Sequence, residues 1–462
     1  MKKDYLEMMR RGESLSFSHL IAMTIQLSIP TILAQISVIV MEYIDASMVG
    51  RLGANATAAI GLVASSTWLF GGLCSSASIG FTVLVSQRIG SSDEKGARRI
   101  MRTGIAFSML FSLILAAVGT GIHRILPELL GGEEAIVKDA SAYFLIFSLA
   151  LPLHQFNSLA AGFLQSSGNM RTPGILEALM CLLDVGFNYV FIFRLDMGVT
   201  GAAMGTAASQ AVTAFLMFYF LLLRSPALHL RKNEPFCFDR TEMKKALKIA
   251  LPVGFEQIVM SSAYIMSTLI VSPLGSVSIA AHSLAVTAES LCYMPGYGIG
   301  VAATTMIGQS IGAERNDLKK KLGYIMVFFG MAVMSVSGAL MYLAAPSMMQ
   351  LLTPVAAIST LGAQMLRIEA FAEPMFAASI VASGVFRGAG DTFVPSCMNL
   401  FSMWAVRIPL SAFLSVRIGL KGVWIAMCIE LCFRGVIFLI RLFAGNSRNK
   451  KENKLSIRSR ER

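Results

Sequence analysis

Charged residues are scarce in this chain. Of its 462 residues only 14% are Asp, Glu, Lys or Arg, whereas 55% are hydrophobic. The mean hydropathy is +0.66. A soluble protein of this size carries about a quarter of its residues as charged side chains. The composition therefore excludes an ordinary water-soluble domain and predicts an integral membrane protein.

Motifs of the common enzyme classes are missing as well. The sequence contains no GxxxxGK[ST] phosphate loop, no HExxH metal helix and no GxSxG nucleophile elbow. These motifs are the usual sequence signs of ATP-driven pumping, zinc proteolysis and serine hydrolysis. We therefore expect a protein that is not an enzyme, that has no cofactor and that takes its energy from an ion gradient.

The cysteine pattern gives no sign of a metal site. Seven cysteines lie mostly within apolar segments, without a CxxC pair and without close Cys/His clustering. Free thiols in such surroundings behave as small apolar residues. Residues 1–18 are largely polar and carry charges of both signs, so we expect no cleavable signal peptide.

What the chain does contain is an internal repeat. Its two halves match at a constant offset of 222 positions, which slips to 221 near their ends, where Gly201 meets Gly422. Two homologous halves related by a pseudo-two-fold axis are the usual architecture of secondary transporters, which move one half against the other. The matches at the offset of 222 are Pro30 with Pro252, Gly53 with Gly275, Ala59 with Ala281, Gln87 with Gln309, Gly90 with Gly312, Gly162 with Gly384, Gly168 with Gly390 and Pro173 with Pro395.

Apolar segments long enough to cross a bilayer recur along both halves. A spanning helix needs about 20 mainly apolar residues. Six such segments per half predict an all-α integral membrane protein of twelve transmembrane helices, with the repeat axis along the membrane normal. The predicted spans are 19–48, 57–86, 103–129, 142–165, 174–193, 201–223, 250–271, 280–307, 323–348, 364–386, 394–415 and 423–443. The predicted domains are an N-terminal lobe (1–223), a cytoplasmic linker (224–246), a C-terminal lobe (247–443) and a basic cytoplasmic tail (444–462).

Lys and Arg collect on alternate loops. With the N-terminus inside, the cytoplasmic segments hold most of them, including the stretches 88–102, 224–248 and 315–321, whereas the opposite loops hold few. This positive-inside asymmetry places both termini in the cytosol. Topology and anionic lipid headgroups then account for the net charge of +12, and we expect membrane lipids as partners and no nucleic acid.

Two aspartates within predicted spans are the main candidates for function. A charged side chain at the bilayer centre costs about 3 kcal/mol on insertion scales and is rarely kept without use. Asp45 and Asp184 have no basic residue within a helical turn on their own helices, and Asp184 shares a helix face with Asn188. Carboxylate and amide oxygens suit a hard cation such as Na⁺. A carboxylate in a low-dielectric setting can also take up and release a proton near neutral pH, so the same residues serve either ion.

Other intramembrane charges favour packing roles. Glu430 precedes Arg434 by four residues on one helix, a spacing that predicts a structural ion pair. Arg407 needs an acid or carbonyl groups nearby, and its sequence context leaves a packing anchor and a functional group equally open. For Asp45 and Asp184 the structural alternative is an aspartate that only hydrogen-bonds neighbouring helices.

Four segments carry a family resemblance. They are Asp45-Ala-Ser-Met-Val-Gly-Arg-Leu-Gly53, Gly162-Phe-Leu-Gln-Ser-Ser-Gly168-Asn, Asn188-Tyr-Val-Phe-Ile-Phe193 followed by Gly198-Val-Thr-Gly-Ala-Ala203, and Gly384-Val-Phe-Arg-Gly-Ala-Gly-Asp-Thr392. Together they look like the multidrug and toxic compound extrusion (MATE) family, in both halves of the chain. The resemblance implies a V-shaped, monomeric protein of two six-helix lobes in a bacterial cytoplasmic (inner) membrane. It also implies export of organic cations and amphipathic compounds in exchange for H⁺ or Na⁺.

The resemblance further implies which residues bind the coupling ion. Family members carry an acid on the first helix, a polar pair on the fifth, a threonine on the sixth and an asparagine on the fourth. In this sequence the matching positions are Asp45 for the first helix, Asp184 and Asn188 for the fifth, Thr206 for the sixth, and Ser158 with its neighbour Asn157 for the fourth. A possible Na⁺ would therefore bind at Asp45, Asp184, Asn188 and Thr206.

The second lobe is expected to be chemically different. Members carry a seventh-helix acid, matched by Glu256, and Glu373 lies where many carry a tenth-helix acid. DinF-like members usually show Asn before Asp on the fifth helix, whereas this chain has Asp184 before Asn188, which moves the charge one turn, roughly 6 Å. The branch, DinF-like or NorM-like, stays open.

The predicted mechanism is alternating access, in which ion and substrate bind the two states unequally. One alternative is a flippase for a lipid-linked saccharide, which would need a more cationic cavity than these spans provide. A channel would need no occluded state. A membrane enzyme would need a nucleophile or a metal cluster, and the sequence offers neither.

Overall fold

The structure, a computed structural model, describes residues 5–231, 234 and 239–460, and their side chains as far as residue 444. The regular secondary structure of these residues is helical. Part of the expected linker (232–233 and 235–238) and the chain ends (1–4 and 461–462) lie outside the described residues. The α-helices are α1 (Tyr5–Arg10), α2 (Phe17–Gly50), α3 (Ala54–Gly90), α4 (Glu94–Ile122), α5 (Ile125–Leu129), α6 (Glu134–Ser166), α7 (Arg171–Asn188), α8 (Gly198–Tyr219), α9 (Arg240–Val271), α10 (Ser276–Gly312), α11 (Asn316–Leu352), α12 (Ala356–Glu369), α13 (Glu373–Gly388), α14 (Phe393–Phe401), α15 (Ile408–Ile418) and α16 (Leu420–Arg460). Short π-helical or 3₁₀ segments continue some of them, namely η1 (Tyr189–Arg194), η2 (Phe220–Arg224), η3 (Ser272–Leu274) and η4 (Ser402–Arg407).

Ten helical segments of the described chain are long and apolar enough to cross a membrane, and the bent pair α12 and α13 makes an eleventh. The predicted span 280–307 lies inside α10, which is not in that count. Glycines and polar residues lower its hydropathy, and several are buried, including Glu289, Thr305 and Gln309. A helix enclosed by other helices faces little lipid, so it can cross the bilayer with a less apolar sequence. With α10, the described residues make twelve passes.

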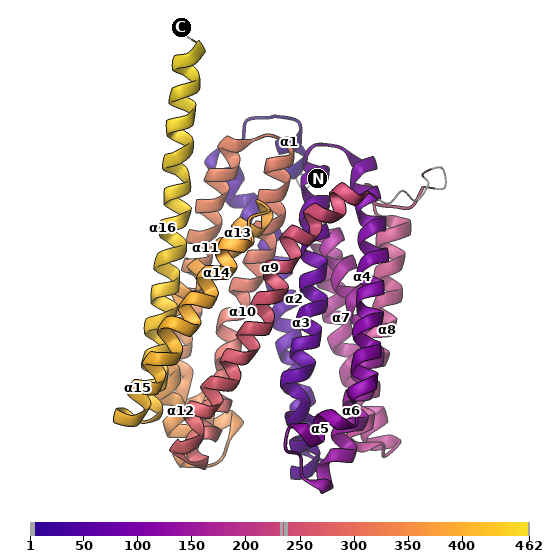
Figure 1. The fold of residues 1–462 in the computed structure, drawn as a ribbon, viewed down its shortest axis with the longest axis vertical. Helices are drawn as coiled ribbons and strands as arrows, with labels where there is room; N and C mark the ends of the chain where they lie inside the picture. Colours follow the sequence, from indigo (N-terminus) through magenta and orange to yellow (C-terminus); the bar gives the residue numbers. More distant parts are fainter. Residues whose placement is uncertain (1–4, 232–233, 235–238, 461–462) are drawn as a thin grey trace.

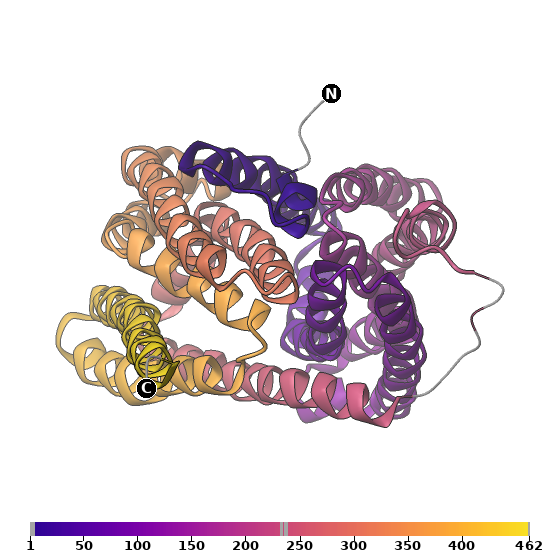
Figure 2. The same ribbon diagram turned by 90° about the horizontal axis from the view of Figure 1, so that it is seen from above.

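The helices form two bundles that lie side by side (Figures 1 and 2). In the first bundle, α3 and α4 pack on α6, and α7 packs on α8; in the second, α10 and α11 pack on α13. Helices of the two bundles meet at several places, chiefly α2 with α10, α3 with α9 and α3 with α10. The two halves of the repeat are thus two six-helix lobes.

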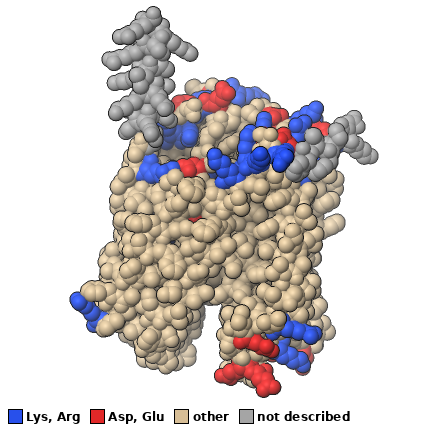
Figure 3. All heavy atoms as spheres, viewed as in Figure 1, with Lys and Arg blue, Asp and Glu red and all other residues tan. Residues whose placement is uncertain are grey.

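A cleft separates the lobes at the end of the molecule opposite the termini. Figure 3 shows the surface hollowed between two legs at its lower edge, and Figure 1 places the N- and C-termini at the upper edge. Lys and Arg side chains gather around the upper edge and are few on the legs (Figure 3). The structure therefore has one open end and one closed end.

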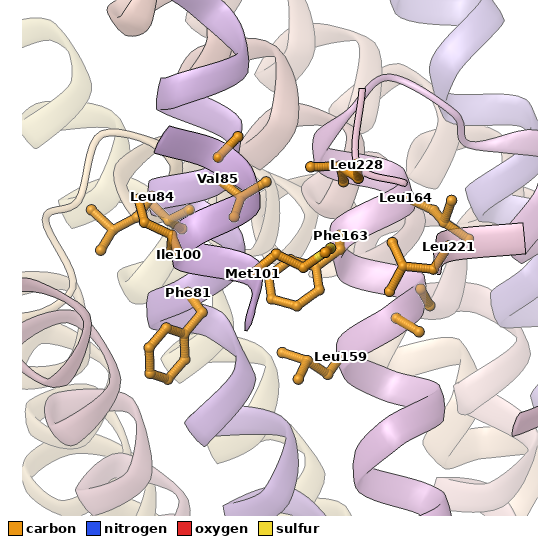
Figure 4. Packing of buried hydrophobic residues seen from close by; sticks show 14 of the residues in the cluster. Phe81, Leu84, Val85, Ile100, Met101, Leu159, Phe163, Leu164, Leu221 and Leu228 are labelled. Carbon is orange, nitrogen blue, oxygen red and sulfur yellow. The ribbon is translucent and has the colours of Figure 1, made fainter. Parts of the chain in front are cut away.

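Buried apolar side chains fill the closed end. In the N-terminal lobe, Phe81 of α3 and Phe163 of α6 belong to one such cluster (Figure 4). In the C-terminal lobe, Met306 of α10 shares a second cluster with Leu6 and Met9 of α1. Helix α1 therefore contributes to the core of the closed end although it lies before the first span.

Two glutamines at equivalent positions of the repeat link the lobes at this end. Gln87 of α3 donates a hydrogen bond to the carbonyl oxygen of Gly388 in α13, at 3.2 Å. Gln309 of α10 donates to the carbonyl oxygen of Ser166 in α6, at 2.7 Å. Both the donors and the acceptors are related by the offset of 222. We refer to these two hydrogen bonds as the glutamine clasp.

Close backbone contact between α3 and α10 brings the glutamines within reach. A Cβ atom on Gly90 would lie 2.2 Å from the carbonyl oxygen of Gln309, and one on Gly312 would lie 1.8 Å from that of Gln87. No side chain fits at those separations, so glycine is required at both positions. The repeated Gly90 and Gly312 thus set the distance between the lobes.

The predicted span 364–386 is broken into two helices, a feature that the sequence did not show. Helix α12 ends at Glu369, α13 begins at Glu373, and their axes differ by 61°. Pro374 occupies the first turn of α13, where its missing N–H is tolerated and its fixed φ favours a helix start. The equivalent helix of the first lobe, α6, runs unbroken through Pro152.

Candidate cation-binding site

Three helices of the N-terminal lobe bring the predicted aspartates together. Helix α2 carries Asp45 and packs against α7, which carries Asp184 and ends at Asn188. Helix α8 packs against α7 and carries Ser209. The four-residue spacing of Asp184 and Asn188 points both side chains toward these neighbours, as the helical period predicts.

The amide of Asn188 links the two carboxylates. Its Nδ2 donates to Oδ1 of Asp45 at 2.8 Å and to Oδ2 of Asp184 at 2.9 Å. The hydroxyl of Ser209 donates to Oδ1 of Asp184 at 3.2 Å. Two carboxylates that share one amide repel each other when both are charged. A bound cation or a shared proton would relieve that repulsion.

The site lies away from water and from basic residues. Asp184 is 0% exposed and Asn188 is 1% exposed, whereas Asp45 is partly exposed. Neither aspartate forms an ion pair with Lys or Arg in the part of the chain that the structure describes. An isolated ionised carboxylate in this setting costs free energy unless a mobile ion or a proton neutralises it.

One oxygen of the cluster is left without a partner. Oδ1 of Asn188 is buried and accepts no hydrogen bond from any described residue. Helix α8 approaches so closely here that a Cβ on Gly205 would lie 1.9 Å from this oxygen. Immediately after Asn188 the chain widens into the π-helix η1, a distortion that is frequent at functional sites. Carboxylate and amide oxygens of Asp45, Asp184 and Asn188 together offer the ligand set that a hard cation prefers.

The other predicted residues of this lobe make different contacts. Thr206 donates to the carbonyl of Ala202 in its own helix, at 3.2 Å. Asn157 donates to the carbonyl of Gln210 at 2.9 Å, and its Oδ1 is buried without a partner among the described residues. Ser158 is partly buried. None of the three is hydrogen-bonded to Asp45 or Asp184 in the described part of the chain, so the four-ligand set with Thr206 stays a prediction.

In the second lobe the acids lie in two places. Glu256 of α9 accepts hydrogen bonds from Ser396 at 2.6 Å and from Asn399 at 2.7 Å. Glu373 lies at the start of α13, 1% exposed; no described N–H or O–H group donates to its carboxylate oxygens, and the thiol of Cys292 lies next to them. Glu256 and Glu373 therefore belong to separate environments.

Two further acids accompany Glu373. Glu369, at the end of α12, is 0% exposed and also has no hydrogen-bond partner among the described residues. Glu289 of α10 is buried and interacts electrostatically with both. We call Glu289, Glu369 and Glu373 the buried glutamate cluster. It flanks the break between α12 and α13.

The predicted ion pair of α16 is present. Nη2 of Arg434 lies 2.6 Å from Oε1 of Glu430, and both side chains are buried. Ser402 of η4 also donates to that carboxylate. Arg407 is buried and contacts the sulfur of Met427. The described contacts of Arg407 fit a packing anchor.

Sequence reasoning missed Ser209. Glu289 and Glu369 are recognisable from the sequence as acids inside predicted spans, but sequence reasoning gave them no role. Ser209 carries no such signal, because serines are common in spanning helices. Only the packing of α8 on α7 brings its hydroxyl to Asp184.

Comparison with known proteins places this geometry in context. A family model described as MatE matches residues 30–190 and 252–413, which is more than half of the chain and includes both lobes. The probable multidrug resistance protein NorM of Thermotoga maritima is 26% identical over 454 residues, which are 95% of this chain and 94% of that protein.

Two solved structures have the same fold. The outward-facing conformation of a multidrug resistance MATE family transporter of the MOP superfamily matches with a TM-score of 0.90 at 20% identity, covering 98% of this chain and 100% of that one. A MOP superfamily transporter from Pyrococcus furiosus, described by a binding pocket of reverse polarity, also gives a TM-score of 0.90 at 20% identity, covering 97% of this chain and 99% of that one. These likenesses confirm the predicted all-α fold of twelve helices in two lobes.

Proposed function

We propose that this chain is a secondary active multidrug exporter driven by H⁺ or Na⁺. The proposal starts from the family: the chain belongs to the MatE family, whose members are transporters. It is a multi-pass membrane protein and a transporter rather than an enzyme. The observation that carries the proposal is the pair of carboxylates, Asp45 and Asp184, joined by one amide in a lobe that borders the open cleft.

Asp45 and Asp184 have different roles in this proposal. Asp45 is partly exposed and Asp184 is fully buried, so an ion that enters from the cleft meets Asp45 first and then the Asp184–Asn188 pair. Binding removes the repulsion between the carboxylates and frees the Asn188 amide to rearrange. Because α2 and α7 carry these groups, a change in their contacts alters how α2 packs against α10 of the other lobe.

The closed end supports alternating access. Transport requires a second state in which the end that holds the termini opens, so the glutamine clasp must break and the cleft must close. The ion and the substrate each drive this change only to the extent that they bind the two states with different affinity. We propose that residues 1–223 and 247–443 move as the two bodies, with 224–246 as the linker between them.

We propose organic cations and amphipathic compounds as substrates. The relatives named above are described as multidrug resistance proteins. Acids outnumber bases among the buried charges of both lobes described above, which favours cationic cargo over anionic cargo. For the same reason a lipid-linked pyrophosphate, the cargo of the alternative flippase function, fits this chain poorly.

We further propose a monomer in a bacterial cytoplasmic membrane with both termini in the cytosol. The relatives include bacterial proteins, and Lys and Arg gather at the end of the molecule that holds the termini (Figure 3). In this orientation the cleft opens to the outside. Lipids and small amphipathic molecules are then the partners of the protein.

Dye efflux from reconstituted vesicles tests the proposal. Efflux is measured first under a pH gradient without Na⁺ and then under a Na⁺ gradient at equal pH, for the unmodified protein and for Asp45→Asn. We expect one gradient to drive efflux in the unmodified protein and neither to drive it in Asp45→Asn. Asp139→Asn is the matched control, because Asp139 is an exposed acid of the same lobe outside the cluster. Efflux by Asp45→Asn at the full rate contradicts the assignment.

A further inference from the structure

A pocket on the flank of the C-terminal lobe combines an unpaired cation with an apolar wall. Its volume is about 320 Å³, and it lies between α11, α12 and α16. Tyr342 and Arg367 form its polar side, and Ile425 and Ile429 of α16 form its apolar side. Phe371, 72% exposed, stands at its edge. Its lining residues Arg367 and Ile429 are close in the sequence to the buried acids Glu369 and Glu430, but no acid is among the residues that line the pocket.

Arg367 has most of its hydrogen-bonding capacity unused. Its Nε donates to the carbonyl oxygen of Tyr342 at 3.3 Å, and its guanidinium carbon lies 5.5 Å from the centre of the Tyr342 ring. A guanidinium has five N–H donors. The described residues provide no partner for the other four and no carboxylate in an ion pair with Arg367. The ring contact restrains the planar guanidinium, and Arg367 is one of the residues that line the pocket.

The position of Arg367 favours an anionic partner. It lies three residues inside the predicted span 364–386, and its side chain is exposed at the surface of α12. A charged side chain that meets lipid on a spanning helix is costly unless a counter-charge reaches it. Lipid phosphate is the anion available at the surface of a spanning helix.

We propose that this pocket binds a glycerophospholipid of the leaflet on the cleft side. The phosphate diester accepts two hydrogen bonds from the free edge of the Arg367 fork, which matches phosphate geometry. One acyl chain lies along Ile425 and Ile429. The bound lipid then braces the break between α12 and α13, which begins two residues beyond Arg367. This site is independent of the proposed function and of the coupling ion.

The repeat indicates that the site is specific to the second lobe. At the offset of 222, Arg367 corresponds to Leu145 and Tyr342 to Thr120. The equivalent helix α6 is unbroken there. The pair of Arg367 and Tyr342 is therefore present in the lobe with the broken helix and has no counterpart in the other lobe.

Native mass spectrometry of the detergent-solubilised protein, titrated with phosphatidylglycerol, tests the proposal. We expect one tightly held lipid, and Arg367→Gln should weaken its binding by about tenfold, as loss of a charge-assisted contact does. Arg417→Gln is the matched control, because Arg417 is also exposed and stacked on an aromatic ring, Phe413, at 4.1 Å, yet does not line the pocket. Equal lipid binding by Arg367→Gln and the unmodified protein overturns the proposal.

A second variant distinguishes a lipid from a free ion. Ile429→Trp fills the apolar side without touching the charge, and we expect it to weaken phosphatidylglycerol binding as well. Inorganic phosphate at millimolar concentration should not displace the lipid. If Ile429→Trp binds lipid normally, or if phosphate alone displaces it, the pocket is an anion site and the lipid assignment is wrong.

Discussion

The two lobes share one scaffold but treat their buried acids in opposite ways. In the N-terminal lobe, Asp45 and Asp184 are hydrogen-bonded through Asn188. In the C-terminal lobe, Glu369 and Glu373 are as deeply buried, yet no described N–H or O–H group donates a hydrogen bond to their oxygens. The first arrangement suits the ligand set that we propose for the coupling ion, whereas the second offers its carboxylates little hydrogen-bond support.

Equivalent positions of the repeat show where the two lobes differ. Asp45 and Asp184 correspond to Ser267 and Val406 in the second lobe. Conversely, the positions of the acids at the α12–α13 break hold apolar residues in the first lobe, Phe147 and Leu151. Each lobe therefore carries acids where the other has neutral residues. The two lobes share the helices and the clasp, and they differ in the few side chains on which the proposed ion site depends.

The largest expected effect comes from the first lobe. Asp184→Asn should lower coupled export by at least about tenfold, because it removes a charge that binds the ion and an acceptor that holds Asn188. Glu373→Gln should lower export less, since no described N–H or O–H group donates to its oxygens. Both are measured as ion-driven dye efflux at matched protein levels. Equal losses in the two variants would show that the lobes share the coupling.

The next effect concerns stability. Arg434→Leu leaves Glu430 buried without its counter-charge and should cost about 3–5 kcal/mol of unfolding free energy. At the offset of 221 the first lobe has Thr213 in place of Arg434, and Thr213→Val should cost only about 1 kcal/mol. Denaturant unfolding in detergent measures both. Removing the pair together, as Glu430→Leu with Arg434→Leu, should recover most of the loss; no recovery would contradict the structural reading of the pair.

Removing either glutamine of the clasp should destabilise the closed end, and the two removals should differ in size. Gln309 is 0% exposed and its hydrogen bond is 2.7 Å, whereas Gln87 is partly exposed and its bond is 3.2 Å. Alanine at either position should favour opening of the closed end by about 1–3 kcal/mol, with the larger value for Gln309. Distances between spin labels on the exposed residues Lys95 and Lys321 report the opening.

A control separates the clasp from general loosening. Gln155 is also buried, but its hydrogen bond to Ser78, at 2.7 Å, stays within the first lobe. Gln155→Ala should leave the spin-label distances unchanged. If it opens the closed end as much as Gln309→Ala does, the clasp has no special role.

The smallest effect concerns the linker, in which Glu234 pairs with Arg98 and Arg102 of the first lobe. The hydrogen bond from Arg98, at 2.8 Å, holds the pKa of Glu234 below its usual value. A lowered pKa means that the contact stabilises the docked linker above the ordinary glutamate pKa of about 4.3 and is lost as the pH falls through the lowered value. Limited proteolysis within residues 225–239 should therefore be slow at pH 7 and faster below about pH 4. In Arg98→Gln the rate should be high at both; a pH-independent rate in the unmodified protein would count against the contact.

Hydropathy and the repeat predicted the twelve passes because both signals can be read directly from the sequence. The length of an apolar segment sets its ability to span, and matched residues such as Gly90 and Gly312 mark equivalent turns of equivalent helices. The break between α12 and α13 was not predicted, since Pro152 in α6 occupies a comparable position without breaking its helix. A proline permits a break, and the surrounding packing decides whether it occurs.

The candidate site was predicted only in part. The residues alone pointed to Asp45 and Asp184 separately, because each lacks a basic neighbour on its own helix, and the family resemblance grouped them with Asn188 in one expected site. Their connection through Asn188, and the contribution of Ser209, depend on how α2 and α8 pack against α7, which no pattern along one helix contains. The partners of Gln87 and Gln309 were hidden for the same reason.

The most direct test of the central claim is cation binding by the purified protein. Isothermal titration with Na⁺ at fixed pH, together with measurement of proton release and uptake, compares two double variants, Asp45→Asn with Asp184→Asn and Glu369→Gln with Glu373→Gln. We predict that the first abolishes binding of the coupling ion and that the second retains it. Binding that survives in the first and disappears in the second would contradict the account and move the ion site to the other lobe.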